Sequence, residues 1–526
     1  MFNKIKFVNV FALLLLFFAG CGSQKDAPIR INIGAEPQTL DPRKARDLQA
    51  QTLTRMFFDG LMRLGKDEKP ECSLAKTYEV SDDGCTYTFH LRDAQWTNGD
   101  VVTAHDFAYA WKKVLDPKFP SDQAFQLYVI SNAQAAIEGK VPLEEVGIRV
   151  LDDKTLQVRL TNPTAHFLEL TTLSVFFPVN SRVDQENPHW DLNADTYVCN
   201  GPFQPAAWKH SDQIEAVKNP HYWDAEHVQL KRIELVMVSE DAELKMYEKR
   251  QLDWAGSPLS ILPVNALPEL KKKDKLQAQP FLATYFFRAN VGKKPLDNAD
   301  LRKALALSIN RTELVDHVTQ GAQIPATGLV PISMGLQSGP YFKDGDVEEA
   351  QKYLGKAEAV SGKAPPLTYI YVAGERNYLI AQAVQQQWRA ALGIEVRLEA
   401  VERKVYFDRL SRRDFDLAAS SWEADFHDPL NFLSIFKLKN GGSNNTNWEN
   451  AKYTALLKKA ESTLDSQERK ECLQKAEAIL IEEMPIIPVF HRRLLYVKKQ
   501  ALCDVVLSSL GALDFKWAYI ASEERK

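Results

Sequence analysis

The sequence predicts an α/β protein in which helices cover the faces of sheets. Helix-like and strand-like segments alternate through the second half of the chain, a pattern typical of that fold class. The chain has 526 residues, enough for two or three domains, and its 45% hydrophobic and 25% charged composition is ordinary for a globular protein. No repeat, low-complexity tract or long linker interrupts it. We therefore expect the domains to abut, with a functional site in the cleft between them.

Hydrophobic periodicity gives the expected elements of the first half. Strands are expected where apolar and polar residues alternate, and helices where apolar residues recur every three or four positions. Thr103 offers an N-cap to one helix and Asp106 lies in its first turn, as in a capping box. We expect strands at 27–33, 87–91, 155–160 and 173–179, and helices at 47–61 and 103–115.

The second half is more regular. One long helix ends before Gly393, a residue that suits a left-handed C-cap. We expect strands at 284–290, 367–372, 394–400 and 485–497, and helices at 300–309, 377–392, 405–410, 452–462 and 467–483.

Residues 415–433 are the most informative stretch. A short apolar strand rich in small residues leads to Asp425, which stands between the aromatic residues Trp422 and Phe426. Asp428 then precedes a proline, a signal for the start of a helix. An acid beside aromatic residues at a strand end can hold a cationic group. The alternative is that Asp425 and Asp428 only cap the next helix.

The N-terminus predicts export. Lys4 and Lys6 precede an apolar run at 8–18 that is too short to span a bilayer comfortably, and small residues lead to Cys21. This pattern resembles a bacterial lipobox and predicts a signal peptide at 1–20 and lipidation at Cys21. The alternative is an ordinary signal peptide with an incidental cysteine. No other apolar run is long enough to span a membrane.

Charge and cysteines exclude other classes. The formal net charge of −4 falls to −6 once Lys4 and Lys6 are removed, so no basic excess suggests nucleic acid. Five cysteines remain, an odd number, and export permits disulfides. Cys72 and Cys85 are the expected pair, and the alternative is that all five are reduced. No Cys/His spacing predicts a metal site.

No constellation predicts catalysis. Ser73 and Lys76 fit the S-x-x-K pattern, but no K-T-G follows, and no G-x-S-x-G, H-E-x-x-H or P-loop occurs. His221 and His227 lie near Asp224 without the spacing that a metal demands. We therefore predict neither an enzyme nor a cofactor.

Several motifs occur in order along nearly the whole chain. They are GAEPQTLDP at 34–42, YTFHLR at 87–92, WTNGDVVTAHDF at 96–107, NGPF at 200–203, NPHYW at 219–223, DLRKAL at 300–305 with NR at 310–311, WEADFHD at 422–428 and PIIPV at 485–489. Together they resemble the family of periplasmic oligopeptide-binding proteins of ABC importers, the family 5 extracellular solute-binding proteins.

That resemblance implies a two-lobed periplasmic-binding-protein clamshell of type II, with an extra small domain inserted in the first lobe. The implied boundaries are 21–58, 181–282 and 491–526 for lobe I, 59–180 for the extra domain and 283–490 for lobe II. The ligand is expected between the lobes, where closure buries it.

The resemblance also implies site residues for an extended peptide whose backbone pairs with protein strands. Asp425 is expected to hold the α-amine of the peptide. The backbone of Ser421 to Glu423 is the expected pairing strand, Trp422 is expected to wall a pocket, the segment Arg46, Asp47 and Leu48 is the second expected pairing segment, and Tyr109 and His491 are expected to line the cavity.

Two positions depart from the family pattern. Ala419 stands where some relatives place an arginine for the peptide carboxylate, so the recognition of the C-terminus is open. Glu423 stands at a pocket position as an extra acid, either solvated or favouring cationic side chains.

The expected function is that of a receptor, lipid-anchored to the membrane of the cell envelope, that passes short peptides to an ABC permease and acts as a monomer. The alternatives are the same fold with a nickel chelate, haem or an oligosaccharide as ligand, or a cell-wall enzyme that uses Ser73 and Lys76.

Overall fold

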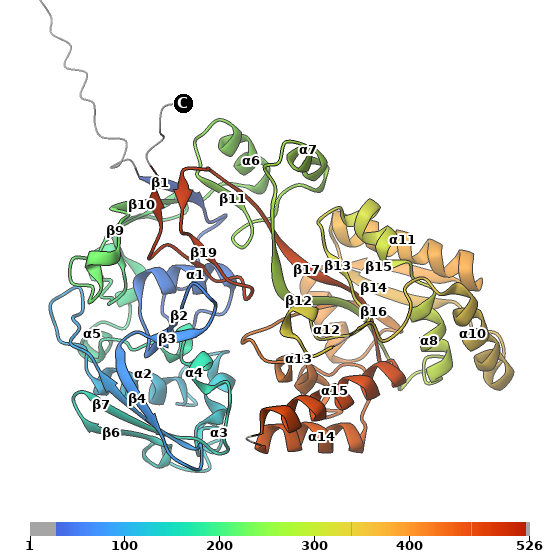
Figure 1. Ribbon diagram of the computed structural model, residues 1–526, viewed down its shortest axis with the longest axis horizontal. Helices are drawn as coiled ribbons and strands as arrows, with labels where there is room; N and C mark the ends of the chain where they lie inside the picture. The colour runs from blue at the N-terminus through green and yellow to red at the C-terminus, as the bar shows by residue number, and fades with distance from the viewer. Residues whose placement is uncertain (1–27, 338, 464, 522–526) are drawn as a thin grey trace, which may run out of the picture.

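The computed structural model of Figure 1 describes residues 28–337, 339–463 and 465–521. It contains two lobes joined by a pair of long strands. The expected signal peptide at 1–20 and the lipidation site Cys21 lie outside the described residues. Within the described part of the chain, no helix is long and apolar enough to cross a membrane.

One mixed sheet of eleven strands extends through both lobes, in the order β15-β14-β16-β12-β17-β11-β1-β10-β9-β8, with β13 (Ile324–Pro325) pairing beside β17. Its lobe I part consists of β1 (Ile29–Asn32), β8 (Phe203–Lys209), β9 (Gln213–Lys218), β10 (Arg232–Val236) and β11 (Trp254–Gly256). Helices α1 (Leu48–Phe57), α6 (Glu240–Glu248) and α7 (Leu267–Lys272) belong to the same lobe.

A separate four-stranded sheet, β4-β5-β7-β6, carries short helices, and we call this unit the small domain. It contains β4 (Ala75–Val80), β5 (Thr86–Leu91), β6 (Ile148–Asp152), β7 (Thr155–Arg159), α2 (Ala104–Val114), the 3₁₀ helix η2 (Ala124–Val129), α3 (Ala133–Ile137) and α4 (Phe167–Leu170). The predicted capping box of α2 is confirmed, with Thr103 and Asp106 as its partners.

Lobe II is the region in which helices and strands alternate. It contains α8 (Ala299–Leu307), the π-helix Leu314–Thr319, α10 (Val347–Ser361), β14 (Leu367–Val372), α11 (Glu375–Leu392), β15 (Val396–Val401), α12 (Arg403–Ser411), β16 (Leu417–Glu423), α13 (Leu430–Leu433), α14 (Ala451–Ser462) and α15 (Ser466–Glu483). The predicted C-cap of α11 at Gly393 is confirmed, because Gly393 has a left-handed φ of 65°.

The two lobes meet along β12 (Gln277–Ala289) and β17 (Ile486–Lys498), which pair antiparallel and run from one lobe to the other (Figure 1). Their register is irregular between Pro280 and Thr284, where the strands pass between the lobes. Broken pairing at one level of a two-strand connection is a mechanically soft point. We infer that this segment is the hinge.

The hydrophobic cores show which parts pack together. One buried cluster spans lobe I and the small domain, and a second fills lobe II. The hinge strands contribute to both, with Phe281 and Leu494 in the first cluster and Phe286 and Ile487 in the second. Because the small domain shares its core with lobe I, these two pack as one body.

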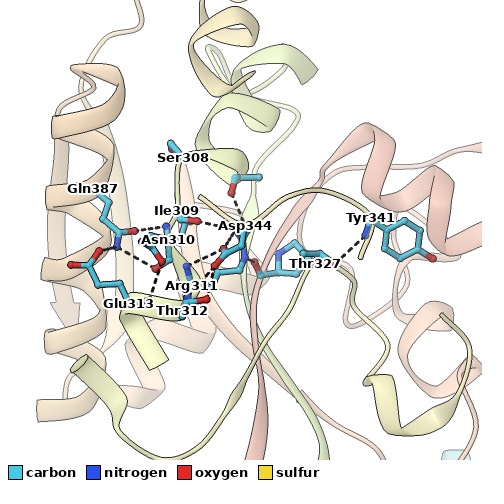
Figure 2. A network of polar contacts seen from close by, with 12 residues as sticks. Ser308, Ile309, Asn310, Arg311, Thr312, Glu313, Thr327, Tyr341, Asp344 and Gln387 are labelled. Carbon is cyan, nitrogen blue, oxygen red and sulfur yellow. Dashed lines mark hydrogen bonds and ion pairs between the residues drawn. The ribbon is translucent and has the colours of Figure 1, made fainter. Parts of the chain in front are cut away.

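Figure 2 shows a polar network around Asn310, Arg311 and Asp344 in lobe II, and this network also reaches β17. Arg311 is fully buried, and its guanidinium donates to the carbonyl of Pro488 at 2.8 Å and to Asp344 at 3.2 Å. Burial lowers the pKa of Arg311 to about 10, and Asp344 opposes that shift. The Asn310–Arg311 motif thus ties a helix start to the hinge strand.

Two sequence predictions are wrong. The expected strand at 173–179 contains a 3₁₀ helix at Ser174–Phe176 instead, because this apolar segment packs into the core and not along a sheet. Cys72 and Cys85 are both free. They lie at opposite ends of the β4–β5 hairpin, where Ala75 pairs with Leu91 beside one of them. Five residues of strand separate the two ends by about 17 Å, beyond disulfide reach.

Candidate functional site

The turn after β16 carries Asp425 and meets the small domain. The ring of His166 stacks on Phe426 with centroids 4.3 Å apart, and Glu169 accepts a hydrogen bond from the backbone N–H of His427. Gln126 of η2 also lies against Asp425. The predicted site residue therefore sits where lobe II faces the body formed by lobe I and the small domain.

The structure decides between the two sequence interpretations of the acids. Asp428 accepts the N–H of Leu430 at 2.8 Å and pairs with Arg469 at 2.8 Å, so Asp428 supports the start of α13. Asp425 makes no hydrogen bond with a helix N–H among the described residues. Among the described residues it forms one hydrogen bond, with Asn431, whose amide donates at 3.4 Å. Asp425 is therefore not a helix cap.

A short relay orients Asp425. The indole N–H of Trp422 donates to the Asn431 side-chain oxygen at 2.7 Å, which turns the amide nitrogen of Asn431 toward Asp425. Burial raises the pKa of Asp425 and the charge of Glu423 raises it further, whereas the amides of Asn431 and Gln126 lower it. A half-buried carboxylate with one long hydrogen bond is poorly compensated and favours a cationic partner.

Gln126 is a residue that the sequence did not indicate. It is 4% exposed, and its amide nitrogen makes no hydrogen bond with any residue that the structure describes. A buried unsatisfied donor facing a carboxylate is costly unless a further group completes the arrangement. The signal in the sequence was faint, because η2 has no regular periodicity.

Ser421 and Glu423 lie on β16 beside the hinge, opposite Tyr285 and Ala283 of β12. Glu423 forms an ion pair with Arg492 of β17, and Ser421 lies 3.5 Å from the same guanidinium. Glu423 is therefore a paired acid, neither freely solvated nor an uncompensated charge.

The three residues of the second expected pairing segment, Arg46, Asp47 and Leu48 of lobe I, lie in different surroundings. Arg46 is exposed, pairs with Asp122 and lines a cavity of about 450 Å³ together with Glu402, Arg403, Lys404 and Phe407 of lobe II. Asp47 is the N-cap of α1 and accepts from Ala50 at 2.8 Å, and Leu48 is the first residue of that helix. Only Arg46 thus faces lobe II across a cavity.

The polar groups of Tyr109 and His491 are hydrogen-bonded to neighbouring residues. The Tyr109 hydroxyl donates a hydrogen bond to Asp184 at 2.7 Å. Burial and, to a smaller extent, this hydrogen bond raise the pKa of Tyr109 to about 12. His491 is 3% exposed, and burial lowers its pKa to about 4. The Thr284 hydroxyl donates to Leu329, so the neutral His491 ring donates to Thr284 through Nδ1, at 2.9 Å.

The structure also places two further candidate sites, the pair Ser73 and Lys76 and the cluster around Asp224. Ser73 is buried, whereas Lys76 is exposed on β4. Asp224, Glu226 and His227 do come together, with potential ligand atoms within 4.8 Å of one another. The ammonium of Lys516 stands 2.9 Å from Asp224 and already supplies a positive charge there.

A two-lobed α/β fold with a hinge of two strands and a poorly compensated carboxylate between the lobes defines a solute-binding clamshell protein. Residues 69–444 match the family model described as bacterial extracellular solute-binding proteins, family 5 Middle. The chain therefore belongs to the family 5 extracellular solute-binding proteins.

Similar proteins carry peptide-binding names. The oligopeptide-binding protein OppA of Bacillus subtilis is 41% identical over 97% of this chain and 99% of its own length, and the dipeptide-binding protein DppE of the same organism is 35% identical over 93% and 91%. The unliganded open form of the periplasmic murein tripeptide-binding protein MppA superposes with a TM-score of 0.81 at 28% identity, covering 96% of this chain and 99% of MppA. Haemophilus influenzae OppA in complex with RPPGFSPFR gives 0.78 at 28% identity, over 95% and 99%.

Proposed function

We propose that this protein captures short peptides between its lobes and delivers them to an ABC importer. The observation that carries the proposal is Asp425, a partly buried carboxylate with one long hydrogen bond at the interface of the two moving bodies. An α-ammonium at this place forms a charge-assisted hydrogen bond and offsets the desolvation of both charges. The peptide-binding names of the relatives support the same ligand class.

The site residues divide into three roles under this proposal. Asp425 binds the amine, the backbone of Ser421 to Glu423 pairs with the peptide backbone, and Trp422 walls a side-chain pocket. Arg46, Asp47 and Leu48 supply the facing segment, while Tyr109 and His491 line the cavity. Backbone pairing is independent of peptide sequence, which suits a receptor for many peptides.

Calorimetry with a free-amine peptide and its N-acetylated form tests the amine role. Wild type should bind the acetylated peptide about 10- to 100-fold more weakly, the range expected for loss of a hydrogen bond to a charged group. Asp425→Asn should bind both forms weakly and nearly equally. Asp82→Asn, at an exposed acid of the small domain, is the matched control and should behave as wild type. Equal affinity of wild type for both peptides would contradict the proposal.

Cell-envelope anchoring is a separate part of the proposal. Lipidation at Cys21 would hold the receptor, as a monomer, at the membrane near its permease. Cys21→Ser should move the protein from the membrane fraction to the soluble envelope fraction without changing peptide affinity. Haem, a nickel chelate or an oligosaccharide found bound to the purified protein by native mass spectrometry would contradict the peptide assignment.

A further inference from the structure

Seven exposed lysine and arginine residues lie at the C-terminal ends of α6 and α7 in lobe I, and we call them the basic face. They are Lys245, Lys249, Arg250, Lys271, Lys272, Lys273 and Lys275. Residues 245–275 contain these seven cations and four acids, a net charge of +3, whereas the whole chain carries −4. Glu240 and Asp241 lie at the opposite end of α6, in its first turn. The basic face is therefore a local reversal of the overall charge.

Few of these charges are neutralised within the protein. Lys273 pairs with Glu269 at 3.1 Å, and the other six side chains form no ion pair or hydrogen bond with any residue that the structure describes. Lys271 and Lys272 border a cavity of about 410 Å³ toward Asp316 of lobe II. The remaining four cations are exposed and unpaired outside that cavity. Complementing two helix dipoles requires fewer cations than this.

The two helix ends belong to one packed unit. Tyr247 of α6 packs in the same hydrophobic cluster as Leu270 of α7 and Leu276, which follows that helix. Lys249 and Lys275 lie within two residues of members of this cluster. Cations from both helices therefore share one surface of lobe I.

The start of the described chain lies beside the basic face. Arg30 donates its backbone N–H to the Asp253 carboxylate at 2.7 Å and its guanidinium to the Gln251 carbonyl at 3.4 Å. Gln251 directly follows Arg250, whose carbonyl accepts from the Lys499 ammonium at 3.3 Å. Figure 1 shows α6, α7 and the start of β1 at one end of the molecule and the small domain at the other.

The proposed lipid anchor brings this end of the molecule close to a membrane. Seven residues, Cys21 to Ala27, connect the predicted lipidation site to Pro28, where the described chain begins. A chain of that length spans at most about 25 Å. An acylated Cys21 therefore keeps the basic face near the lipid headgroups. Such a short tether raises the effective concentration of the headgroups, so weak contacts are sufficient for binding.

We propose that the basic face binds the anionic lipid headgroups of the membrane that holds the anchor. This inference rests on the proposed anchoring at Cys21 and is independent of the ligand that the lobes bind. An anionic surface attracts basic residues within a Debye length of about 10 Å, and each of them strengthens binding about fivefold. With α6 and α7 toward the membrane, the small domain faces away from it (Figure 1).

Amine footprinting of the mature lipidated protein, reconstituted in vesicles, tests this orientation. Vesicles of phosphatidylcholine alone are compared with vesicles that also contain about 30% phosphatidylglycerol, an anionic lipid. Acetylation of Lys245, Lys249 and Lys275 by a membrane-impermeant reagent, quantified by mass spectrometry, should slow about three- to tenfold on the anionic vesicles. Lys76, exposed on the small domain, should react equally on both. Salt at about 0.5 M should abolish the protection.

Two variants separate the basic face from net charge. The test variant replaces three of its cations, by Lys249→Gln, Arg250→Gln and Lys275→Gln. The matched control replaces three exposed lysines of α14 and α15, by Lys452→Gln, Lys458→Gln and Lys470→Gln. The test variant should reduce the protection of Lys245 to within about twofold of none, whereas the control should retain it. Thermal unfolding of both should match wild type, because all six residues are exposed.

Two outcomes would overturn the inference: equal acetylation of the basic face on neutral and anionic vesicles, or equal slowing at Lys76. The first would also be observed if the basic face bound an acidic protein, such as a permease, and not lipid. If the protein does not stay with neutral vesicles, the anchoring at Cys21 fails and the inference fails with it. Peptide affinity measured by calorimetry on the same preparation decides separately whether the peptide-binding proposal stands.

Discussion

Two acids of lobe II, the buried Glu477 and the half-buried Asp425, are built in opposite ways. Glu477 of α15 is fully buried and accepts the N–H groups of Leu329 and Val330 at 2.8 Å each, the amide of Gln337 at 3.1 Å and the hydroxyl of Tyr341 at 3.0 Å. Asp425 has one hydrogen bond, at 3.4 Å. Burial raises the pKa of both acids, to about 7 for Glu477.

The difference separates a structural acid from a ligand-binding acid. The four donors to Glu477 come from a loop that also reaches the hinge, because the Leu329 carbonyl accepts from Thr284 of β12. Removing Glu477 would leave those donors unpaired inside the core. Asp425 has few protein partners to lose, so its hydrogen-bonding capacity is available to a ligand.

The largest expected effect is on stability at Glu477. Glu477→Ala should lower the free energy of unfolding by about 3–5 kcal/mol, because several buried donors lose their acceptor at once. Denaturant unfolding monitored by tryptophan fluorescence measures this change. Glu471→Ala, on the exposed side of the same helix, should cost less than about 0.5 kcal/mol. Equal losses at both positions would remove the contrast.

The second effect is the pH dependence of stability that Glu477 causes. Its folded pKa of about 7 lies above the ordinary value of 4.5, so the folded state binds more protons between these values. The stabilisation is therefore present at acidic pH and is lost as pH rises from 4.5 to 7, by about 3 kcal/mol. The stability difference between wild type and Glu477→Gln should shrink by about that amount between pH 5 and pH 8.

Comparing wild type with Glu477→Gln also removes an opposing contribution to the pH dependence of stability, which comes from His491. Burial lowers the pKa of His491 to about 4, so the unfolded state takes up its proton first and stability falls as pH falls from 6.5 to 4. This term is common to both proteins and cancels in their difference. An unchanged difference across the pH range would show that Glu477 does not titrate there.

The local sequence pattern was sufficient to predict much of the secondary structure of lobe II. The strand expected at 367–372 has those bounds, and the helix expected at 377–392 begins only two residues earlier, because regular periodicity with a glycine cap is a local property. The strand expected at 173–179 was wrong for the complementary reason: an apolar run does not itself distinguish a buried strand from a buried turn of helix.

The site was less predictable than the fold. The hinge pairing of Thr284 with His491 joins residues 207 positions apart, and the approach of Gln126 to Asp425 depends on how two bodies meet. Such relations arise from tertiary packing, which periodicity along one strand or helix does not encode.

The third effect concerns Asp425 and reverses the pattern at Glu477. Asp425→Asn should change the free energy of unfolding by less than about 1 kcal/mol, in the stabilising direction if at all, since a poorly compensated charge is removed. Affinity for a free-amine peptide should still fall about 10- to 100-fold. Denaturant unfolding and calorimetry on one protein preparation measure the two quantities. A stability loss as large as that of Glu477→Ala would make Asp425 a structural acid.

The smallest effect tests whether the small domain contributes to the amine site. The Gln126 amide lowers the pKa of Asp425, so Gln126→Ala should raise that pKa further. Peptide binding needs the ionised carboxylate, and its loss on acidification should therefore begin at higher pH in the variant, with affinity reduced about two- to fivefold at neutral pH. Gln134→Ala, at an exposed amide of α3, should leave the pH profile unchanged. A uniform loss of affinity at every pH would mean that Gln126 only packs against the turn, whereas a shifted profile shows that the small domain tunes the charge of Asp425.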